Sequence, residues 1–297
     1  MRVLVTGSAA HLAAPLLPML CNRREIEAVI GFDIRPSRFS HPKFSARTGD
    51  IRQLDLTLLD AVDAVIHLAF VVLRGRTSPR DMHEINVTAS QRLFTAAREK
   101  GVKIVHLSSA SVYGQGVLLQ EEAPFAPLRG FLYGEHKAEL ELWMAQHVPA
   151  AVRLRPHIIL GRQAQPLLLF ILRLPVFLRL PEPQPQLQCI HEQDVATAIV
   201  AALLADASGP FNLAAPQTYD FRSLVRRRHP HAVGIPLWLA RLWLYLAWKG
   251  FGAGAEPGWL DGAQHTLTLN CRRAETLLAF RPQHSLEETL EESAVRR

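Results

Sequence analysis

Cysteine is scarce in this 297-residue sequence, whose three cysteines are Cys21, Cys189 and Cys271. They lie far apart and form no CxxC pair, so neither a disulfide framework nor a zinc site is expected. This spacing is typical of buried, reduced thiols. The sequence therefore predicts no metal site and a cytoplasmic location.

Long hydrophobic runs are also missing. No stretch reaches the roughly 18 uninterrupted apolar residues that a membrane span needs. The apolar N-terminus does not fit a signal peptide, because Gly7, Ser8, His11 and two prolines interrupt it. Apolar residues nevertheless make up 48% of the chain, which is enough for a substantial core.

Aromatic residues are absent from the dense basic run Arg226–His231, which reads RRRHPH. Without stacking platforms beside the cations, this run argues against nucleic-acid binding. A solvated basic surface is the ordinary explanation of the net charge of +6. Anionic ligands or membrane headgroups are the alternative partners of such a surface.

Strands and helices alternate in the first half of the chain. The β-rich runs are RVLVT, EAVIGFD, DAVIHLAF and KIVHLSS, and the helical patterns include AAPLLPMLCNR and VTASQRLFTAAREKG, which stops at Gly101. This alternation predicts an α/β fold, a Rossmann-type doubly wound parallel sheet with helices on both faces. Prolines cluster between Pro166 and Pro185. We therefore expect a dinucleotide-binding domain over residues 1–155 and a smaller C-terminal substrate-binding lobe over 156–297, partly interleaved with the sheet.

Two glycines are missing from the segment LVTGSAAHLA, residues 4–13. Gly7 ends the first strand as in a dinucleotide-binding loop, but Ala10 and Ala13 stand where further glycines are expected. Alanine is an accepted substitute at the third position. At the second position, the methyl group of Ala10 crowds the pyrophosphate. A left-handed backbone there would cost about 1–2 kcal/mol, or about tenfold in affinity.

An acidic residue, Asp33, ends the second predicted strand 20 residues after Ala13. A carboxylate at this place accepts hydrogen bonds from the adenosine ribose and repels a 2′-phosphate. NAD is therefore favoured over NADP, although the nearby Arg35 keeps NADP open.

A tyrosine and a lysine, Tyr133 and Lys137, lie four residues apart in a helical pattern and so share one face. A nearby ammonium lowers the pKa of a phenol, which ordinarily lies near 10. Such a tyrosine can exchange a proton with a substrate hydroxyl while a nicotinamide exchanges hydride. Ser109, in the cluster HLSSASVYG at the end of the fifth predicted strand, is placed to hold the substrate oxygen.

Taken in order, these motifs resemble an extended short-chain dehydrogenase/reductase of the NAD-dependent epimerase/dehydratase family over nearly the whole chain. Further matching segments are GDIRQLD, HLAF, INVTAS, LRPHIILGR and IHEQDVATAI. The resemblance implies a triad of Ser109, Tyr133 and Lys137, with Lys137 also bonding the nicotinamide ribose. It also implies a homodimer formed by the helices that precede and carry Tyr133. The implied cofactor contacts are Gly7, Ala10, His11, Leu12, Asp33, Ile34, Arg35, Asp50, Ile51, Leu68, Ala69, Asn86, Tyr133, Lys137 and Pro156.

The substrate region departs from the sugar-nucleotide enzymes of that family. His157 and aliphatic residues follow Arg-Pro where an asparagine is usual, and Leu187 stands where an arginine would grip a diphosphate. A buried diphosphate without cationic partners is unfavourable. The segments LLLFILRLPVFLRL and IPLWLARLWLYLAW (235–248) are apolar on most faces. Core packing is the ordinary explanation, an apolar substrate pocket the second, and peripheral membrane contact, flanked by Arg241 and Lys249, the third.

Three functional hypotheses follow. The first is an NAD-dependent oxidoreductase that transfers hydride at a secondary alcohol or ketone of an apolar small molecule. The second is a sugar-nucleotide epimerase or dehydratase. The third, favoured by Ala10, is an NAD(P)-binding regulatory protein with little turnover.

Overall fold

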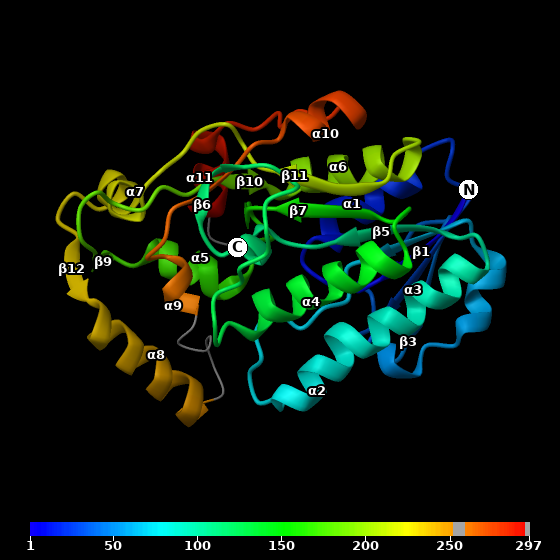
Figure 1. Cartoon of the computed structure of the whole chain (residues 1–297), viewed down its shortest axis with the longest axis horizontal. Helices are drawn as coiled ribbons and strands as arrows, with labels where there is room; N and C mark the ends of the chain where they lie inside the picture. The colour runs from blue at the N-terminus through cyan, green and yellow to red at the C-terminus, as the bar shows by residue number, and fades with distance from the viewer. Residues whose placement is uncertain (252–258, 295–297) are drawn as a thin grey trace.

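A seven-stranded parallel sheet forms the centre of the computed structural model, which describes residues 1–251 and 259–294 (Figure 1). The strand order is β3-β2-β1-β4-β5-β7-β11. The strands are β1 (Arg2–Thr6), β2 (Ala28–Asp33), β3 (Phe44–Thr48), β4 (Ala64–His67), β5 (Lys103–Leu107), β7 (Val152–Pro156) and β11 (Gly209–Leu213). The order reverses between β1 and β4, as in a doubly wound Rossmann fold, so the predicted fold class is confirmed.

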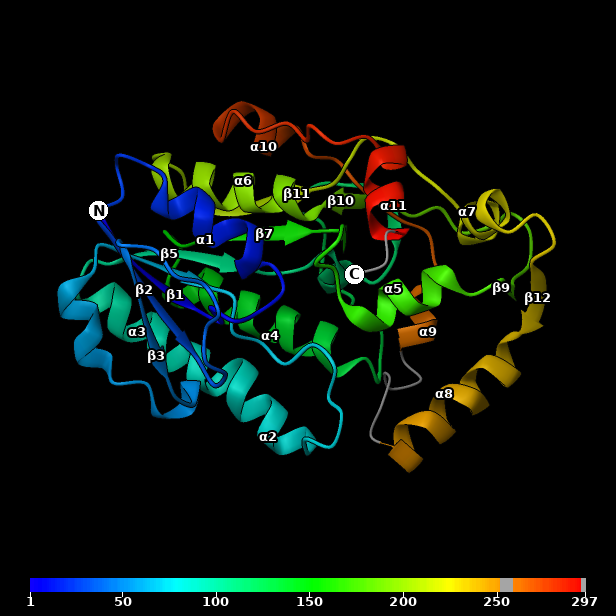
Figure 2. The ribbon, with the colours of Figure 1, turned by 180° about the vertical axis from the view of Figure 1, so that it is seen from behind.

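Helices cover both faces of this sheet (Figures 1 and 2). One face carries α1 (Ala13–Cys21) and α6 (Glu192–Leu204), which pack on Val3 and Val5. The other carries α3 (Ala89–Glu99) and α4 (Leu132–His147), packed on Leu4 and its neighbours. Alternate residues of β1 thus enter two separate cores, which explains why the central strands are apolar throughout.

Short helical segments connect the strands. They are η1 (Ile51–Gln53), η2 (Leu56–Ala61), α2 (Pro79–His83), the π-helical η3 (Glu84–Thr88) and η4 (Ala110–Tyr113). Gly101 has φ +67°, and α3 ends two residues before it, so the predicted helix stop is confirmed.

Most of the rest of the chain forms small two-stranded sheets and helices beside the carboxyl ends of the strands, whereas α10 (Arg272–Leu277) packs against β11 (Figure 2). The pairs are β6 (Gly116–Leu119) with β13 (Leu267–Leu269), β8 (Ile158–Leu160) with β10 (Cys189–His191), and β9 (Val176–Arg179) with β12 (Val233–Pro236). The helices are α5 (Pro166–Arg173), α7 (Phe221–Arg228), α8 (Leu237–Phe251), α9 (Trp259–Gly262), α10 (Arg272–Leu277) and α11 (Leu286–Ala294). Between them, α6 and β11 return the chain to the main sheet.

Core packing, the ordinary explanation of the apolar segment 235–248, accounts for only one side of α8. Ala240 and Leu244 are buried, but Trp238 is 66% exposed and Leu246 58% exposed. The expectation fails here because α8 lies at the edge of the molecule and contacts the rest of the protein along a narrow stripe (Figure 1).

Candidate active site

The carboxyl ends of β1, β4, β5 and β7 lie at one edge of the sheet, because all the strands are parallel. Thr6 pairs with His67 across β1 and β4, where the strand order reverses. Ligands of open α/β sheets bind in the crevice at such a switch point. Gly7, Asp33, Leu68 and Pro156 all stand at or just after strand ends and therefore border this crevice.

Gly7 makes the close approach that the loop after β1 requires. Its φ is +76°, and a Cβ atom at this position would lie 2.6 Å from the backbone nitrogen of Ala69 and 2.8 Å from the carbonyl carbon of Leu68. A side chain here would therefore clash with backbone atoms. The segment Leu68–Ala69, predicted to lie beside the cofactor, backs directly onto this loop.

The strain predicted at Ala10 is not present. Among the described non-glycine residues, positive φ values occur at Leu118 and Ala279 and not at Ala10. The Ala10 N–H donates to Gly7 O at 2.9 Å, and the Ala13 N–H donates to Ala10 O at 3.0 Å. After Gly7 the chain thus enters α1 through successive turns, and Ala10 itself does not adopt a left-handed conformation. The other part of the prediction, that the Ala10 methyl group crowds the pyrophosphate, is unaffected by this finding.

Helix α1 begins directly after the same loop, so its N-terminus lies at this edge of the sheet. Its N-cap is Leu12, directly after His11, and within the described part of the chain no side chain caps this end. No acidic residue occupies the first turn. Among the described residues, neither the cap nor the first turn of α1 thus supplies an anion to this positive helix end, as an anion-binding N-terminus requires.

Asp33 ties the loop after β1 to the loop after β2. Its carboxylate accepts from the Ala9 and Arg35 N–H groups, each at 2.9 Å, and is 8% exposed. The Arg35 guanidinium donates to Ala9 O at 2.6 Å. Ile34, between them in sequence, is exposed. A carboxylate oxygen accepts more than one hydrogen bond, so Asp33 retains acceptor capacity.

Two other predicted cofactor residues, Asp50 and Asn86, form hydrogen bonds that hold neighbouring parts of the chain in place. The Asp50 carboxylate bonds the Arg52 guanidinium at 2.7 Å, and this contact lowers the pKa of Asp50. Ile51 beside it is buried. The buried Asn86 accepts from the Val71 N–H at 2.7 Å and donates to Val71 O at 3.0 Å, which fixes the loop after β4.

The structure brings the predicted triad together. The Ser109 side chain caps η4 by accepting from the Ser111 N–H at 3.1 Å, and it lies close enough to Tyr133 to lower the pKa of that hydroxyl. Lys137, one turn further along α4, donates to Leu107 O at 2.5 Å. The triad therefore connects the end of β5 with the first two turns of α4.

The electrostatics of the triad differ from the expectation. Burial raises the pKa of Tyr133 to about 12, against the effect of its hydrogen bond with Ser109. Burial also lowers the pKa of Lys137 well below its usual value, with the charge of Glu141 opposing this. The predicted lowering of the tyrosine pKa by lysine is therefore wrong for this arrangement. The Lys137 ammonium lies 5.8 Å from the centre of the Tyr133 ring and bonds a carbonyl.

Aromatic rings surround Tyr133. Phe70, Phe131 and Trp259 have ring centres 5.7, 5.6 and 6.2 Å from that of Tyr133. The Lys137 ammonium lies 3.5 Å from the centre of the Phe70 ring. Sequence reasoning missed Trp259, because nothing in its local pattern indicates that α9 returns to a tyrosine 126 positions earlier.

A buried ion pair fixes α4 against the sheet. The Arg155 Nε donates to Glu141 Oε1 at 2.8 Å, and the Ser108 hydroxyl donates to the same oxygen at 2.5 Å. Both members of the pair are nearly unexposed. Burial is the largest single effect and lowers the pKa of Arg155, but the hydrogen bonds and charge interactions with Glu141 and Tyr113 together raise it. The pair positions the helix that carries Tyr133 and Lys137.

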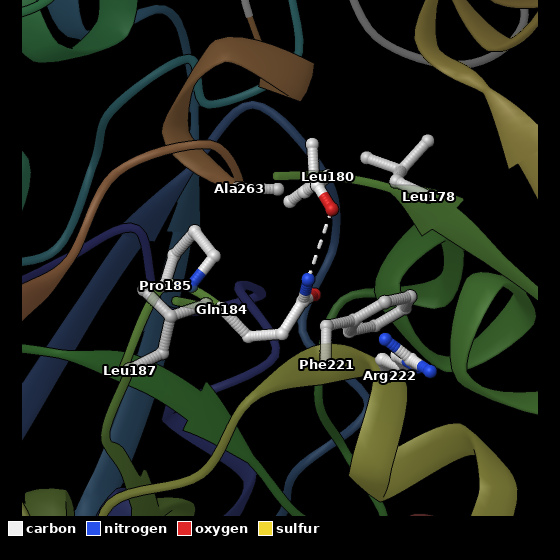
Figure 3. A pocket seen from close by; sticks show the side chains of 8 residues that line it. All are labelled: Leu178, Leu180, Gln184, Pro185, Leu187, Phe221, Arg222 and Ala263. Carbon is white, nitrogen blue, oxygen red and sulfur yellow. Dashed lines mark hydrogen bonds between the residues drawn. The ribbon is translucent and has the colours of Figure 1, made fainter. Parts of the chain in front are cut away.

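His157 and Leu187, the two residues that depart from the sugar-nucleotide enzymes, both pack within the folded protein. His157 is buried, contacts Leu267 O at 2.9 Å and accepts from the Ile158 N–H at 2.8 Å. Leu187 lines a small pocket together with Arg222 of α7 and Ala263, which follows α9 (Figure 3). An adjoining groove of about 320 Å³ is lined by Arg179, Arg222 and Arg226. Sequence reasoning missed this cluster because its arginines come from two distant elements.

Comparison with known sequences identifies the family. The chain matches the NAD dependent epimerase/dehydratase family over residues 3–214. It is 27% identical over 293 residues to an uncharacterized protein of Mycobacterium tuberculosis, covering 90% of this chain and 73% of that protein. It is 33% identical over 135 residues to a UDP-glucose 4-epimerase of Klebsiella pneumoniae, covering 38% of this chain and 93% of that protein.

Solved structures share the fold over almost the whole chain. One is a UDP-N-acetylglucosamine 4-epimerase from Methanobrevibacter ruminantium M1 in complex with UDP-N-acetylmuramic acid, with a TM-score of 0.77, 21% identity, and coverage of 99% of this chain and 96% of that chain. Another is a UDP-glucuronic acid 4-epimerase from Bacillus cereus in complex with UDP-glucuronic acid and NAD, with a TM-score of 0.73, 21% identity, and coverage of 99% and 98%. The family match spans most of the sequence, so the chain belongs to the NAD dependent epimerase/dehydratase family. The predicted class of enzyme is confirmed.

Proposed function

We propose that this protein transfers hydride between NAD and a secondary alcohol or ketone of an apolar small molecule, with Tyr133 as the acid/base. The observation that carries the proposal is the proximity of the Ser109 and Tyr133 side chains, which come from the end of β5 and the first turn of α4. A hydroxyl pair at this place can bind a substrate oxygen and exchange a proton with it.

The residues around the crevice fit NAD. The uncapped N-terminus of α1 suits a pyrophosphate, and Gly7 brings the loop backbone close to the strand ends. Asp33 retains acceptor capacity for ribose hydroxyls and its charge opposes a 2′-phosphate. NAD, when bound, supplies the carbon that accepts or donates hydride. We assign the adenine side to Asp50 and Ile51.

The raised pKa of Tyr133 favours reduction of a ketone. With a pKa of about 12, the phenol is protonated at neutral pH and is a poor base. It can nevertheless donate its proton to the more basic alkoxide that forms as a carbonyl receives hydride. Ser109 holds the same oxygen, and Lys137, anchored on Leu107 O, positions the face of α4 that carries Tyr133.

The aromatic wall of Phe70, Phe131 and Trp259 supports an apolar substrate. Such rings bury apolar surface and provide no partner for an anionic group. His157 and Leu187, at the two places where sugar-nucleotide enzymes use polar side chains, support the same conclusion, because one is engaged with backbone and the other is apolar.

A sugar nucleotide is the second candidate, and the arginine groove favours it. Arg222 reaches the pocket that Leu187 lines, so it can replace a diphosphate-binding arginine there (Figure 3). Arg179 and Arg226 add two further cations to the adjoining groove. Guanidinium groups bind phosphate oxygens bidentately. The curated UDP-glucose 4-epimerase relative makes this class of substrate the natural comparison.

The first test is calorimetric titration with NADH and NADPH, followed by assays with apolar ketones and with UDP-sugars. We expect tighter binding of NADH and oxidation of NADH by ketones. Tyr133→Phe should lower turnover by about 10²–10⁴-fold while NADH affinity stays unchanged. Unaltered turnover in this variant would refute the assigned chemistry.

A paired variant separates the two substrate classes. Arg222→Gln combined with Arg226→Gln should weaken UDP-sugar binding and leave ketone turnover unchanged. Turnover of UDP-sugars alone would replace the first candidate by the second. Cofactor binding without any turnover would instead favour the regulatory protein.

A further inference from the structure

The outer side of α8 is an unusual surface for a folded protein. Six of its large apolar side chains are more than 40% exposed. They are Trp238, Leu239, Leu242, Trp243, Tyr245 and Leu246. We call them the exposed face of α8. Contiguous exposed apolar surface of this kind marks an interaction site.

The helix has two apolar sides with different neighbours. At about 100° per residue, the exposed face fills one continuous arc of about 160°. The buried residues Ala240 and Leu244 lie on the opposite side and pack against the protein. Folding of the chain therefore explains the inner side, while the outer side has no apolar partner among the described residues.

The position of α8 makes this face accessible. Both ribbon views show the helix at the periphery, projecting away from the central sheet (Figures 1 and 2). One end follows β12, and near the other the Trp248 indole N–H donates to Gly75 O at 2.9 Å. The Arg74 guanidinium lies 4.7 Å from the centre of the Trp248 ring. The helix is thus held at both ends with its outer face directed away from the body.

The charges around this face are mostly positive. Within its 15 residues, α8 contains Arg241 and Lys249 and no acidic residue. Asp261, on α9, pairs with Arg241. The groove arginines lie in the same lobe, on β9 and α7, where Glu182 pairs with Arg222. The whole chain has a net charge of +6. An anionic surface complements this arrangement, whereas a second copy of α8 would bring like charges together.

The residue types match the interface of a lipid bilayer. Three of the five tryptophans in the chain lie on α8, together with a tyrosine, leucines and flanking basic residues. Tryptophan and tyrosine favour the level of the lipid headgroups, and basic residues are attracted to anionic lipids. Within residues 1–251 and 259–294, no helix has the length and apolarity to cross a bilayer. Such a helix would lie in the plane of the surface.

We propose that the exposed face of α8 docks this protein peripherally on an anionic lipid bilayer. The apolar side chains enter the headgroup region, while Arg241, Lys249 and the neighbouring arginines face the lipid phosphates. The exposed face of α8 supports this docking whatever reaction Tyr133 carries out.

Co-sedimentation of the full chain with vesicles tests the proposal. We expect binding to vesicles of phosphatidylcholine with phosphatidylglycerol, weaker binding to phosphatidylcholine alone, and a decrease with added salt. The triple variant Trp238→Ser, Trp243→Ser, Leu246→Ser should bind the anionic vesicles at least about tenfold more weakly. Circular dichroism establishes that the variant is folded.

A matched control removes exposed apolar side chains elsewhere. Val117 and Leu277 are 69% and 54% exposed and lie on β6 and α10, so Val117→Ser with Leu277→Ser should leave vesicle binding unchanged. Failure of the wild-type chain to bind anionic vesicles overturns the proposal, as does equal binding by the triple variant. A wild-type dimer that the triple variant converts to monomer, without vesicle binding, would assign the face to a second copy instead.

Discussion

Strand β4 and helix α8 are both built from apolar residues, yet they meet opposite environments. Every residue of β4 is buried, because strands lie on both sides of it and helices above and below. Six large apolar residues of α8 are exposed, because the protein contacts a single stripe of that helix. Apolar side chains thus favour burial away from water, but the number of elements packed around a segment determines whether folding buries them.

Two arginine–carboxylate pairs offer the strongest way to test this contrast. Arg155→Leu leaves Glu141 buried without its partner and should lower the free energy of unfolding by about 3–5 kcal/mol. Arg241→Leu removes a pair with Asp261 whose side chains are 46% and 30% exposed, so a loss below about 1 kcal/mol is expected. Denaturant titration measures both losses. Equal losses would show that α8 belongs to the cooperative core.

Two leucines provide the same contrast without charge. Leu93 in α3 is 1% exposed, and Leu93→Ala should cost about 2–5 kcal/mol of unfolding free energy. Leu246 in α8 is 58% exposed, and Leu246→Ala should change it by less than about 0.5 kcal/mol. Thermal and urea unfolding give the two values. A large loss at Leu246 would mean that the outer face is packed in solution.

Acid should destabilise the region of the central sheet, because histidines are buried there. Helix α8 contains no histidine and should not contribute to this effect. Burial lowers the pKa of His67 to about 3 and that of His157 to about 4. The unfolded chain therefore binds more protons below about pH 6.5, so stability is full above that pH and falls towards pH 4. Each histidine contributes a loss of about 1.4 kcal/mol per pH unit over this window.

Urea unfolding between pH 7 and 4.5 measures this slope. Replacing the buried histidine in His157→Gln should make the slope shallower. His231→Gln, at an exposed position, is the matched control and should leave the slope unchanged. A pH-independent unfolding free energy would contradict the neutral, buried state of these histidines.

The smallest effect is expected at Ala10. Since its backbone is not left-handed, Ala10→Gly relieves no strain and removes only the methyl group beside the pyrophosphate site. NADH should bind more tightly, by less than about tenfold, because the added chain flexibility opposes the gain. Calorimetry gives the two affinities. Weaker binding in the variant would show that the loop approaches the cofactor along another path.

Sequence patterns predicted the strands, helix ends and helix faces that depend on interactions between residues close together in the sequence. Buried parallel strands such as β4 are continuous apolar runs, and a glycine such as Gly101 ends a helix through its own conformation. The spacing of Tyr133 and Lys137 on one helix face followed from the same local rules, whereas their grouping with Ser109 was implied by the family resemblance.

What the sequence did not reveal depends on contacts between distant segments. Trp259 reaches Tyr133, and Arg222 meets Leu187, through the packing of elements that no local period connects. The raised pKa of Tyr133 arises from its burial in the folded chain, and α8 is exposed because no described element covers its outer face. These properties belong to the tertiary arrangement and have no signature in any single window of residues.

The contact between Trp248 and Gly75 makes one loop common to two binding events. That loop follows β4, begins beside Phe70 and is held by Asn86, while its other side carries the end of α8. Where a bilayer restrains α8 and a cofactor restrains the loop, linkage requires the two effects to be reciprocal. The factor by which vesicles change NADH affinity then equals the factor by which NADH changes vesicle affinity, so either factor gives the coupling free energy between the two sites.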